Sequence, residues 1–357
     1  MKGVFRVGKL KVGIIGVGGI AKGAHIPGYL RLKDKVEIVA LCDIIPERAQ
    51  KKAAELEIKH VFTDYNQMLE MDEIDIISVC TPNYAHAPAT IAALNAGKHV
   101  ICEKPMARNA KEAAEMVKAY KKSGKTLTVG YQWRFDPDIQ ALKSLIDNGE
   151  FGEIYFAKAI ATRRRGIPAW GDFLNLEKQG GGPLVDIGTH ALDLTLYLMG
   201  NPQPETVLGS SYTKIADKGC LNNFRDYDPK DYQVEDAAFG YIKMKNGATL
   251  SLETSWAMNI MDDEIFGTEV YGSLSGARFH CGKPLTVVSE AHERININQI
   301  LRRDKIGSNY HAEIEHFVDC ILEGKEPLVK PEEALNVMKI QDAIYASQKT
   351  KAAITIE

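Results

Sequence analysis

A glycine-rich turn near the start of the chain constrains the fold more than any other feature. An apolar run at residues 11–15 leads into Gly16-Val17-Gly18-Gly19-Ile20-Ala21, and a helical pattern follows. The spacing Gly16-x-Gly18-x-x-Ala21 matches the dinucleotide-binding fingerprint. Gly16 would make the tight turn, Gly18 would let backbone N–H groups approach a pyrophosphate, and Ala21 would let the helix pack on the strand. The phosphate charge would then lie at a helix N-terminus.

An acidic residue at the end of the second apolar run strengthens this interpretation. Residues 36–42 have the composition of a β-strand, and Asp43 follows them, where a carboxylate is expected to receive the hydroxyls of the adenosine ribose. Because a carboxylate there would repel a 2′-phosphate, the sequence favours NAD over NADP. Arg48 could reach a 2′-phosphate, but its place in a helix opened by Pro46 favours a solvated position.

Bulk composition limits the class of protein. The length of 357 residues suggests about two domains, and 45% hydrophobic residues, 25% charged residues and a net charge of −3 are typical of a soluble globular protein. Because no basic stripe stands out, no nucleic-acid partner is expected, and no apolar run is long enough to span a bilayer. The basic segment at residues 1–9 lacks a cleavage pattern, so no secretory signal is predicted. Six single cysteines without a C-x-x-C pair are typical of the reduced core of a cytoplasmic protein.

Strand and helix patterns alternate up to about residue 130, which predicts right-handed βαβ crossovers and a doubly wound parallel sheet of the Rossmann type. The expected strands cover 11–15, 36–42, 60–62, 75–80, 98–102 and 126–129, and the expected helices cover 19–31, 46–56, 65–70, 84–96 and 110–123. In an open parallel sheet, ligands bind at the carboxyl ends of the strands. We therefore expect Thr81-Pro82-Asn83 and Glu103-Lys104-Pro105, which follow two of these strands, to face the cofactor.

The pattern changes after Gly130, so we divide the chain into domains at 1–130 and 131–357. A helix is expected to follow the segment at 131–137. Alternating runs and the turn Lys245-Asn246-Gly247 then predict an α+β domain with a large, mainly antiparallel open sheet. The runs cover 153–163, 205–213, 235–244, 248–257, 265–272 and 275–280, and the helices cover about 186–199, 310–323 and 331–348. The polar segment at 215–231 is expected to be a surface insertion.

Several short motifs, taken together and in order, resemble one family over nearly the whole chain. It is the glucose-fructose oxidoreductase, inositol dehydrogenase and rhizopine-catabolism family, abbreviated Gfo/Idh/MocA. The motifs are the fingerprint, Thr81-Pro82-Asn83 with His86, Glu103-Lys104-Pro105, Arg134-Phe135, Gly180-Gly181-Gly182 with Asp186-Ile187-Gly188-Thr189-His190, and Glu313-Ile314-Glu315-His316-Phe317. The resemblance implies a Rossmann domain, an α/β substrate domain whose open sheet forms a homo-oligomer (dimer, tetramer or higher), and nicotinamide-dependent redox chemistry on a carbohydrate or cyclitol.

Three residues are expected to carry the chemistry. Oxidation of a secondary alcohol requires a base and a group that stabilises an alkoxide. His190 is the expected base, Lys104 the polarising acid or proton relay, and Asp186, one helical turn before His190, the residue that orients the histidine or binds substrate. Without the resemblance, Lys104 would be a surface lysine and His190 a core histidine. The resemblance also implies a cis peptide before Pro105, and the division of proton transfer between Lys104 and His190 stays open.

Further residues are expected to bind the cofactor or the substrate. A loop at 163–171 combines arginines with a tryptophan that could stack on a hydroxylated ring. The expected cofactor-binding residues are Gly16, Gly18, Gly19, Ile20, Asp43, Arg48, Thr81, Pro82, Asn83, His86, Glu103, Lys104, Gln132, Arg134 and Trp170. The expected substrate-binding residues are Lys104, Arg163, Trp170, Asp186, His190 and Tyr310. The pairs Asp186 with His190, Glu313 with His316 and Glu57 with His60 could each hold a metal, but because no third ligand is grouped with them, no metal is predicted.

The sequence and the resemblance together predict an NAD-dependent dehydrogenase that acts on a ring hydroxyl of a sugar, glycoside or cyclitol. The third carbon of a sugar is one position that members of this family oxidise. One alternative is an oxidoreductase that keeps NAD bound and recycles it with a second sugar or keto acceptor. Another is a non-catalytic nucleotide-sensing protein. The presence of Lys104, Asp186 and His190 argues against a sensor, because a sensor need not keep a proton relay.

Overall fold

The computed structural model describes residues 8–300 and 307–356, and the chain divides into two compact units. The first contains the described parts of Met1–Met106, together with Ala114–Gln132 and Gly307–Pro331. The second contains Ala107–Ala113, the described parts of Trp133–Ile306, and Glu332–Glu357. Most of the basic N-terminal segment, for which no secretory signal is predicted, lies outside the described residues.

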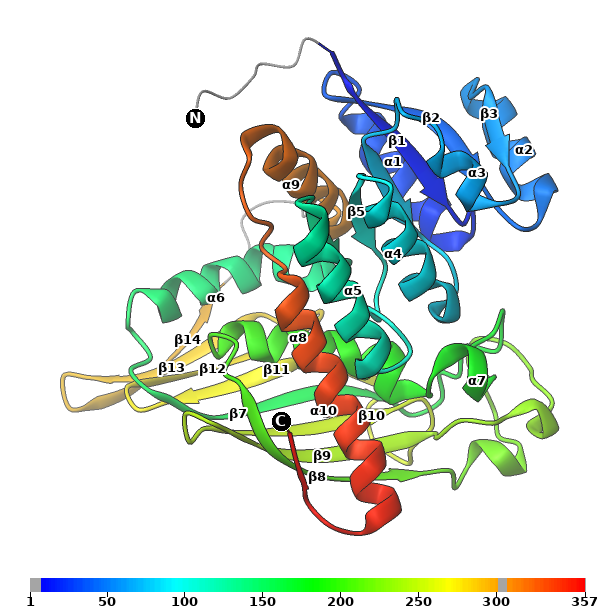
Figure 1. The fold of residues 1–357 in the computed structure, drawn as a ribbon. Coiled ribbons are helices and arrows are strands. Elements are labelled where there is room, and N and C mark those ends of the chain that lie inside the picture. Colours follow the sequence, from blue (N-terminus) through cyan, green and yellow to red (C-terminus); the bar gives the residue numbers. More distant parts are fainter. Residues whose placement is uncertain (1–7, 301–306, 357) are drawn as a thin grey trace. The chain divides into compact units, whose positions relative to one another are not determined.

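The first unit is built on a six-stranded parallel sheet in the order β3-β2-β1-β4-β5-β6 (Figure 1). This is the doubly wound order of dinucleotide-binding sheets, so the predicted Rossmann fold is confirmed. The strands are β1 (Leu10–Ile15), β2 (Val36–Cys42), β3 (His60–Phe62), β4 (Ile76–Val79), β5 (His99–Cys102) and β6 (Leu127–Val129). The helices and turns are η1 (Ala21–His25), α1 (Ile26–Arg31), α2 (Pro46–Leu56), α3 (Tyr65–Leu69), η2 (Asn83–Ala85), α4 (His86–Asn95), α5 (Ala110–Ser123), which begins in the second unit, and α9 (Asn309–Glu323).

Helix α9 packs in the first unit although it lies far along the chain. A Cβ at Gly28 of α1 would approach Ile314 to 2.6 Å, so glycine allows the two helices to touch. Ile314 and Phe317 join a buried core cluster with Val12 and Ile14 of β1. The apolar stripe of this helix therefore closes the nucleotide unit, which the sequence pattern alone does not reveal.

The second unit is built on a nine-stranded sheet in the order β14-β13-β12-β11-β7-β10-β9-β8-β15. Only β7 and β10 are parallel neighbours, so the prediction of a mainly antiparallel sheet is confirmed. The strands are β7 (Ile154–Arg163), β8 (Pro204–Tyr212), β9 (Ala237–Met244), β10 (Thr249–Ser255), β11 (Glu264–Gly272), β12 (Ser275–His280), β13 (Leu285–Ala291), β14 (Arg294–Ile300) and β15 (Ile354–Thr355). The helices and turns are η3 (Gln132–Phe135), α6 (Pro137–Asp147), α7 (Leu176–Gln179), η4 (Leu184–Gly188), α8 (Thr189–Leu198), η5 (Ala216–Lys218), η6 (Pro229–Asp231) and α10 (Pro331–Thr350).

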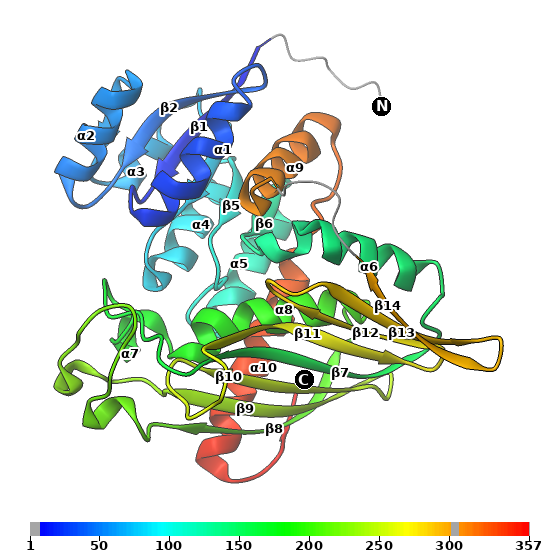
Figure 2. The same cartoon turned by 180° about the vertical axis from the view of Figure 1, so that it is seen from behind.

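Helices cover one face of the large sheet. Figures 1 and 2 show α6, α8 and α10 along this face. A row of paired residues across the strands, Val207, Ile242, Leu250, Ala157 and Val270, is fully buried beneath them. The core of the second unit lies in this layer between the sheet and the helices.

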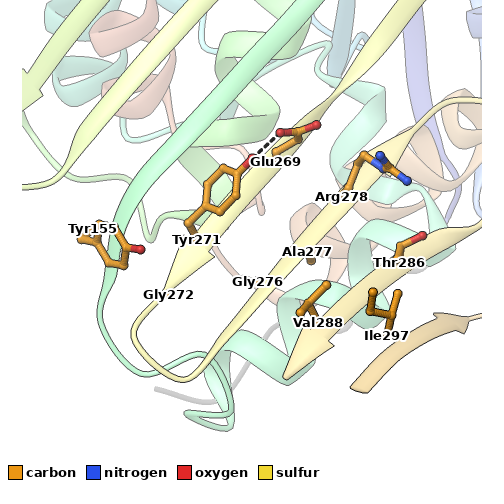
Figure 3. A pocket seen from close by; sticks show the side chains of 10 residues that line it. All are labelled: Tyr155, Glu269, Tyr271, Gly272, Gly276, Ala277, Arg278, Thr286, Val288 and Ile297. Carbon is orange, nitrogen blue, oxygen red and sulfur yellow. Dashed lines mark hydrogen bonds between the residues drawn. The ribbon is translucent and has the colours of Figure 1, made fainter. Parts of the chain in front are cut away.

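In residues 133–300 and 332–356, no helix covers the opposite face of the sheet. A groove of about 500 Å³ lies on it, lined by Tyr155, Tyr271, Val288, Ile297 and six other residues (Figure 3). Two of its lining residues pair with each other, since the Tyr271 hydroxyl bonds Glu269, and Lys158 Nζ outside the lining lies 3.2 Å from Glu269 Oε2. None of the residues expected to bind cofactor or substrate lines this groove.

The prediction that the cysteines lie in the core is confirmed only in part. Cys42, Cys80, Cys102 and Cys320 are buried, but Cys220 is half-buried and Cys281 is exposed. The core interpretation therefore holds for four of the six, because Cys281 lies just beyond the end of β12 and Cys220 lies in the polar insertion. In residues 8–300 and 307–356, every helix is too short or too polar to cross a bilayer.

Candidate active site

The glycine turn has the geometry that a dinucleotide needs. Gly16 has φ +89°, and a Cβ there would lie 2.6 Å from the Cys80 carbonyl oxygen, so only glycine fits. A Cβ at Gly18 or Gly19 would meet no heavy atom within 4 Å. The backbone therefore faces open space just before the helix that runs through η1 and α1, and a pyrophosphate fits at this N-terminus.

Asp43 is buried beside this turn. Its Oδ2 accepts the backbone N–H of Val17 at 2.8 Å, and its Oδ1 accepts the N–H of Ile45 at 2.9 Å. Each carboxylate oxygen keeps a second lone pair for a ribose hydroxyl. Asp43 thus ties the end of β2 to the glycine turn, whereas Arg48 is exposed on α2. These residues fit the adenosine half of a dinucleotide.

His86 links the loops that follow two neighbouring strands. Its Nδ1 lies 2.7 Å from the Pro105 carbonyl oxygen and its Nε2 lies 2.8 Å from the Thr81 carbonyl oxygen. Burial lowers the pKa of His86, so the neutral ring donates to one carbonyl at a time. These contacts favour a positioning role for His86 over the expected direct contact with the cofactor.

A buried hydrogen-bond network supports the loop after β5. Glu103 Oε1 lies 2.9 Å from His25 Nε2, and His25 Nδ1 lies 3.3 Å from Ser78 Oγ. The Tyr29 hydroxyl lies 2.7 Å from the same Ser78 oxygen, and burial raises the pKa of Tyr29. A His25 ring that donates to Glu103 through Nε2 and accepts from Ser78 through Nδ1 satisfies all four groups. The other carboxylate oxygen of Glu103 accepts the backbone N–H of Lys104 at 3.2 Å.

Lys104 therefore lies in a loop that hydrogen bonds hold in place at the carboxyl end of a central strand. Its side chain is half-buried, and the Lys104–Pro105 peptide is cis, as the resemblance implies. The network gives Glu103 a supporting contact with the backbone of Lys104, which the sequence pattern does not show.

Gln132 and Tyr310, which are far apart in sequence, meet in the first unit. Gln132 Nε2 donates to the Tyr310 hydroxyl at 3.1 Å. Gln132 Oε1 is buried and has no hydrogen-bond partner among the described residues. A buried carbonyl oxygen of this kind is costly unless it accepts a hydrogen bond, so it can receive an amide or hydroxyl group of a bound molecule.

Asp186 and His190 lie one turn apart in the second unit. Asp186 is in the π-helical turn η4 and His190 is in the first turn of α8, and they are 6% and 9% exposed. Trp256 Nε1 donates to Asp186 Oδ2 at 3.1 Å. Such π-helical turns are frequent at functional sites. The segment thus holds an acid and a histidine, both largely shielded from water.

The triple-glycine motif allows the segment before η4 to pack closely against the residues just before β9. A Cβ at Gly182 would lie 2.3 Å from the Glu235 carbonyl oxygen, and the Gly182 N–H donates to Glu235 Oε2 at 2.9 Å. The Tyr345 hydroxyl bonds Glu235 Oε1 at 2.9 Å, and burial raises the pKa of Glu235. Glycine is required here because the backbones touch, and the contact fixes the segment that contains Asp186.

Arg134 has a structural environment. It is 1% exposed, and its NH2 lies 2.6 Å from Asp193 Oδ1 and its NH1 2.5 Å from Glu333 Oε2. Its guanidinium also lies 4.9 Å from the centre of the Tyr197 ring. Two carboxylates and a ring therefore surround the cation, which favours an anchoring role in the second unit over the expected contact with the cofactor.

The loop at 163–171 presents its aromatic residue to solvent. Trp170 is 45% exposed, and its ring centre lies 5.8 Å from those of Phe173 and Phe224. Arg163 Nε donates to Glu264 Oε1 at 2.8 Å, and its guanidinium lies 5.2 Å from the Phe224 ring centre. The structure thus links Arg163 and Trp170 through a residue of the insertion.

Sequence reasoning missed several residues of this site. His25, Trp256, Glu235 and Phe224 each support an expected residue. His25 could have been found because it lies four residues after Ala21, on the inner side of the fingerprint helix. Trp256 directly follows β10, Glu235 lies just before β9, and Phe224 lies in the insertion, so no periodic pattern marks their contacts. Across the described ranges, no three His, Cys, Asp or Glu side chains gather as a metal site would need.

These features define a class of protein, the oxidoreductases that bind a nicotinamide dinucleotide on a Rossmann unit. The chain belongs to the Gfo/Idh/MocA oxidoreductase family. Its residues 10–131 match the family's NAD-binding Rossmann fold, and residues 143–356 match the C-terminal alpha/beta domain of the same family.

Individual relatives agree with this assignment over most or all of the chain. D-glucoside 3-dehydrogenase of Escherichia coli (strain K12) is 36% identical, with 100% of both chains covered. The scyllo-inositol 2-dehydrogenase (NAD(+)) of Bacillus subtilis (strain 168) is 30% identical over 85% of each chain. The crystal structure of an oxidoreductase domain protein from Kribbella flavida superposes with a TM-score of 0.87 at 25% identity, covering 98% of this chain and 99% of that one.

Proposed function

We propose that this protein is an NAD-dependent dehydrogenase that transfers a hydride between a ring hydroxyl of a sugar, glycoside or cyclitol and the nicotinamide. The observation that supports it most is the pair of buried titratable side chains, Asp186 and His190, one turn apart in the substrate unit. Burial of an acid and a histidine together is costly unless it serves a purpose. The third carbon of a glucoside is the favoured position, since the full-length relative at 36% identity is a D-glucoside 3-dehydrogenase.

Three residues of the chain perform the proton chemistry in this proposal. NAD, when bound, supplies the hydride acceptor. His190 takes the proton of the reacting hydroxyl, because imidazole is a base near neutral pH. Asp186 orients His190 and favours its cationic form. Lys104 donates a hydrogen bond to the reacting oxygen, or relays its proton, as charge develops there.

The cofactor residues of the proposal lie in the first unit. The turn at Gly16, Gly18, Gly19 and Ile20 receives the pyrophosphate, and Asp43 receives the adenosine ribose. The rest of the dinucleotide is proposed to contact Thr81, Pro82, Asn83 and Gln132. Arg163, Trp170 and Tyr310 are proposed to contact substrate, and a cofactor contact is a second role for Trp170. In the proposal, His86, Glu103 and Arg134 hold the neighbouring loops and helices in position. Arg48 lies on the solvated side of α2.

The proposal includes a homo-oligomer and a cytoplasmic location. The uncovered face of the large sheet supports the first, because apolar side chains on it are widely exposed, including Leu208 at 54%, Tyr241 at 52% and Ile297 at 68%. Cytoplasmic residence rests on the single cysteines, four of which are buried. The comparisons do not favour a nucleotide sensor or recycling of a tightly held NAD, since the relatives bear the names of dehydrogenases.

A substrate panel tests the proposal. We expect the absorbance of reduced nicotinamide to rise when the purified protein and NAD meet one class among free sugars, glycosides and inositols. Glycosides with a free third hydroxyl are expected to give the largest rise. A denatured sample should release no more than a trace of nucleotide. Absence of any rise, with NAD binding intact, would contradict the proposal, and nucleotide retained on the protein would favour the recycling alternative.

A charge change at Asp43 tests the cofactor assignment. Asp43→Asn removes the negative charge and one acceptor, so we expect the ratio of kcat/KM for NAD over NADP to fall by about 10- to 100-fold, the range for hydrogen bonds to a charged group. Steady-state rates with each cofactor measure this ratio. The control is Lys51→Ala on the exposed side of α2, which should leave the ratio unchanged. An unaltered ratio in Asp43→Asn would remove Asp43 from the ribose site.

A further inference from the structure

Four aromatic rings form a row in the second unit. Phe224 comes from the insertion, Trp170 and Phe173 from the segment after β7, and Trp256 from the end of β10. Neighbouring ring centres lie 5.8 Å apart from Phe224 to Trp170, 5.8 Å from Trp170 to Phe173, and 6.3 Å from Phe173 to Trp256. These are contact distances for offset or edge-to-face rings.

Hydrogen bonds fix the insertion beside the loop that contains Trp170. The Asn222 side chain accepts the Ile167 N–H at 2.9 Å and donates to the Ile167 carbonyl at 2.8 Å. At the base of the insertion, the buried Asp236 carboxylate accepts three consecutive backbone N–H groups, those of residues 214 to 216. Phe224 is therefore held in place before any ligand binds, which lowers the entropy cost of binding.

The row connects solvent with the proposed reaction centre. Trp256 is fully buried and donates to Asp186, Phe173 is partly buried, and Trp170 and Phe224 are 45% and 48% exposed. Two neighbouring exposed rings at fixed positions offer an apolar contact surface to a bound ring. The inner end of the row contacts Asp186, which is proposed to bind or orient the substrate, and the outer end is exposed to solvent. The outer rings therefore lie where a substituent on a bound sugar ring would extend toward solvent.

We propose that Trp170 and Phe224 form a subsite for the apolar substituent, the aglycone, of a glycoside whose sugar ring lies at Asp186 and His190. The inference rests on the proposed function and adds the substrate class to it. Arg163 lies 5.2 Å from the Phe224 ring centre and is paired with Glu264, so its charge is neutralised and the subsite prefers an uncharged ring. Because the aglycone does not react, its contacts act equally on the ground state and the transition state and change KM without changing kcat.

The test compares substrates that differ only in their substituent. We would measure kcat and KM for phenyl and methyl glucosides of both anomeric forms, in the wild type and in Trp170→Ala and Phe224→Ala. Loss of either ring should raise KM for the phenyl glucoside by about 3- to 10-fold, the range for an aromatic pair. In Phe224→Ala, whose ring has no other proposed role, the KM for the methyl glucosides and the kcat for every glucoside should stay unchanged. Leu221→Ala is the matched control, because Leu221 lies in the same insertion, is 87% exposed and is outside the row.

Two results would overturn the subsite. One is an equal rise in KM for the methyl and phenyl glucosides, which would indicate contact with the sugar or a general disturbance. The other is unchanged KM for both. If no sugar, glycoside or inositol is oxidised, the proposed function fails, and calorimetric titration of phenyl glucoside into the protein with NAD decides the subsite separately. Binding that weakens in Phe224→Ala but not in Leu221→Ala supports the subsite, and absence of binding refutes it.

Discussion

Lys104→Met is expected to lower kcat by about 10²- to 10⁴-fold, the contribution of a positioned proton donor or acceptor, while the Kd for NAD stays within about twofold. The fold should survive, because the bond from the backbone N–H of residue 104 to Glu103 is kept in the variant. Steady-state kinetics give kcat, and titration of nucleotide fluorescence gives the Kd. The loss in kcat/KM should be similar to the loss in kcat, since the interaction is made chiefly in the transition state.

The control for this change lies at the opposite end of the same strand. Lys98 immediately precedes β5 and donates to the Met71 carbonyl oxygen at 2.9 Å, so Lys98→Met should leave turnover unchanged. The pH profile separates Lys104 from His190. If His190 is the base, oxidation rises with pH through the histidine range in the Lys104→Met variant as well. Unchanged turnover in that variant would show that Lys104 takes no part in the reaction.

Periodic features of the chain were predictable because the physical cause lies within a short window. The alternation of apolar runs and helical patterns gave the six parallel strands, and the turn at Lys245-Asn246-Gly247 marked the hairpin between β9 and β10. The glycine spacing at Gly16 and Gly18 followed from a backbone requirement, which the close approach to Cys80 confirms. The position of Asp43 at a strand end placed it beside the glycine turn.

Features that depend on tertiary contacts were missed. The hairpin of β13 and β14 escaped notice because its turn uses His292 and Glu293, both with positive φ, in place of Asn-Gly. The ion pairs of Arg134 could not be predicted, because its partners, Asp193 and Glu333, are distant in sequence and meet it only in the folded unit. Its expected contact with the cofactor stays a prediction. The same reason hides the contacts of Glu103 with His25 and of Trp170 with Phe224. The spacing of residues in the sequence predicts the element on which a side chain lies, but its contacts depend on the packing of the folded unit.

Arg134→Met should destabilise the second unit by about 3–5 kcal/mol, the cost of leaving a buried charge without its partner. Asp193 is 1% exposed and would lose its counter-ion. Urea unfolding measures the loss. Lys143→Met is the control, since Lys143 pairs with Asp147 at the surface of the neighbouring α6 and lies 5.4 Å from the same Tyr197 ring. Its loss should be about 0.5 kcal/mol or less.

The pH dependence separates an unpaired charge from lost packing. Burial raises the pKa of Asp193 to about 6 even beside Arg134, and removal of the cation should raise it further. Because this folded-state pKa lies above the unfolded value of about 3.9, the folded variant takes up a proton as pH falls, and its stability rises. The deficit relative to wild type should therefore shrink between about pH 8 and pH 5. A deficit that is constant over this range would instead indicate that Arg134 acts through packing alone.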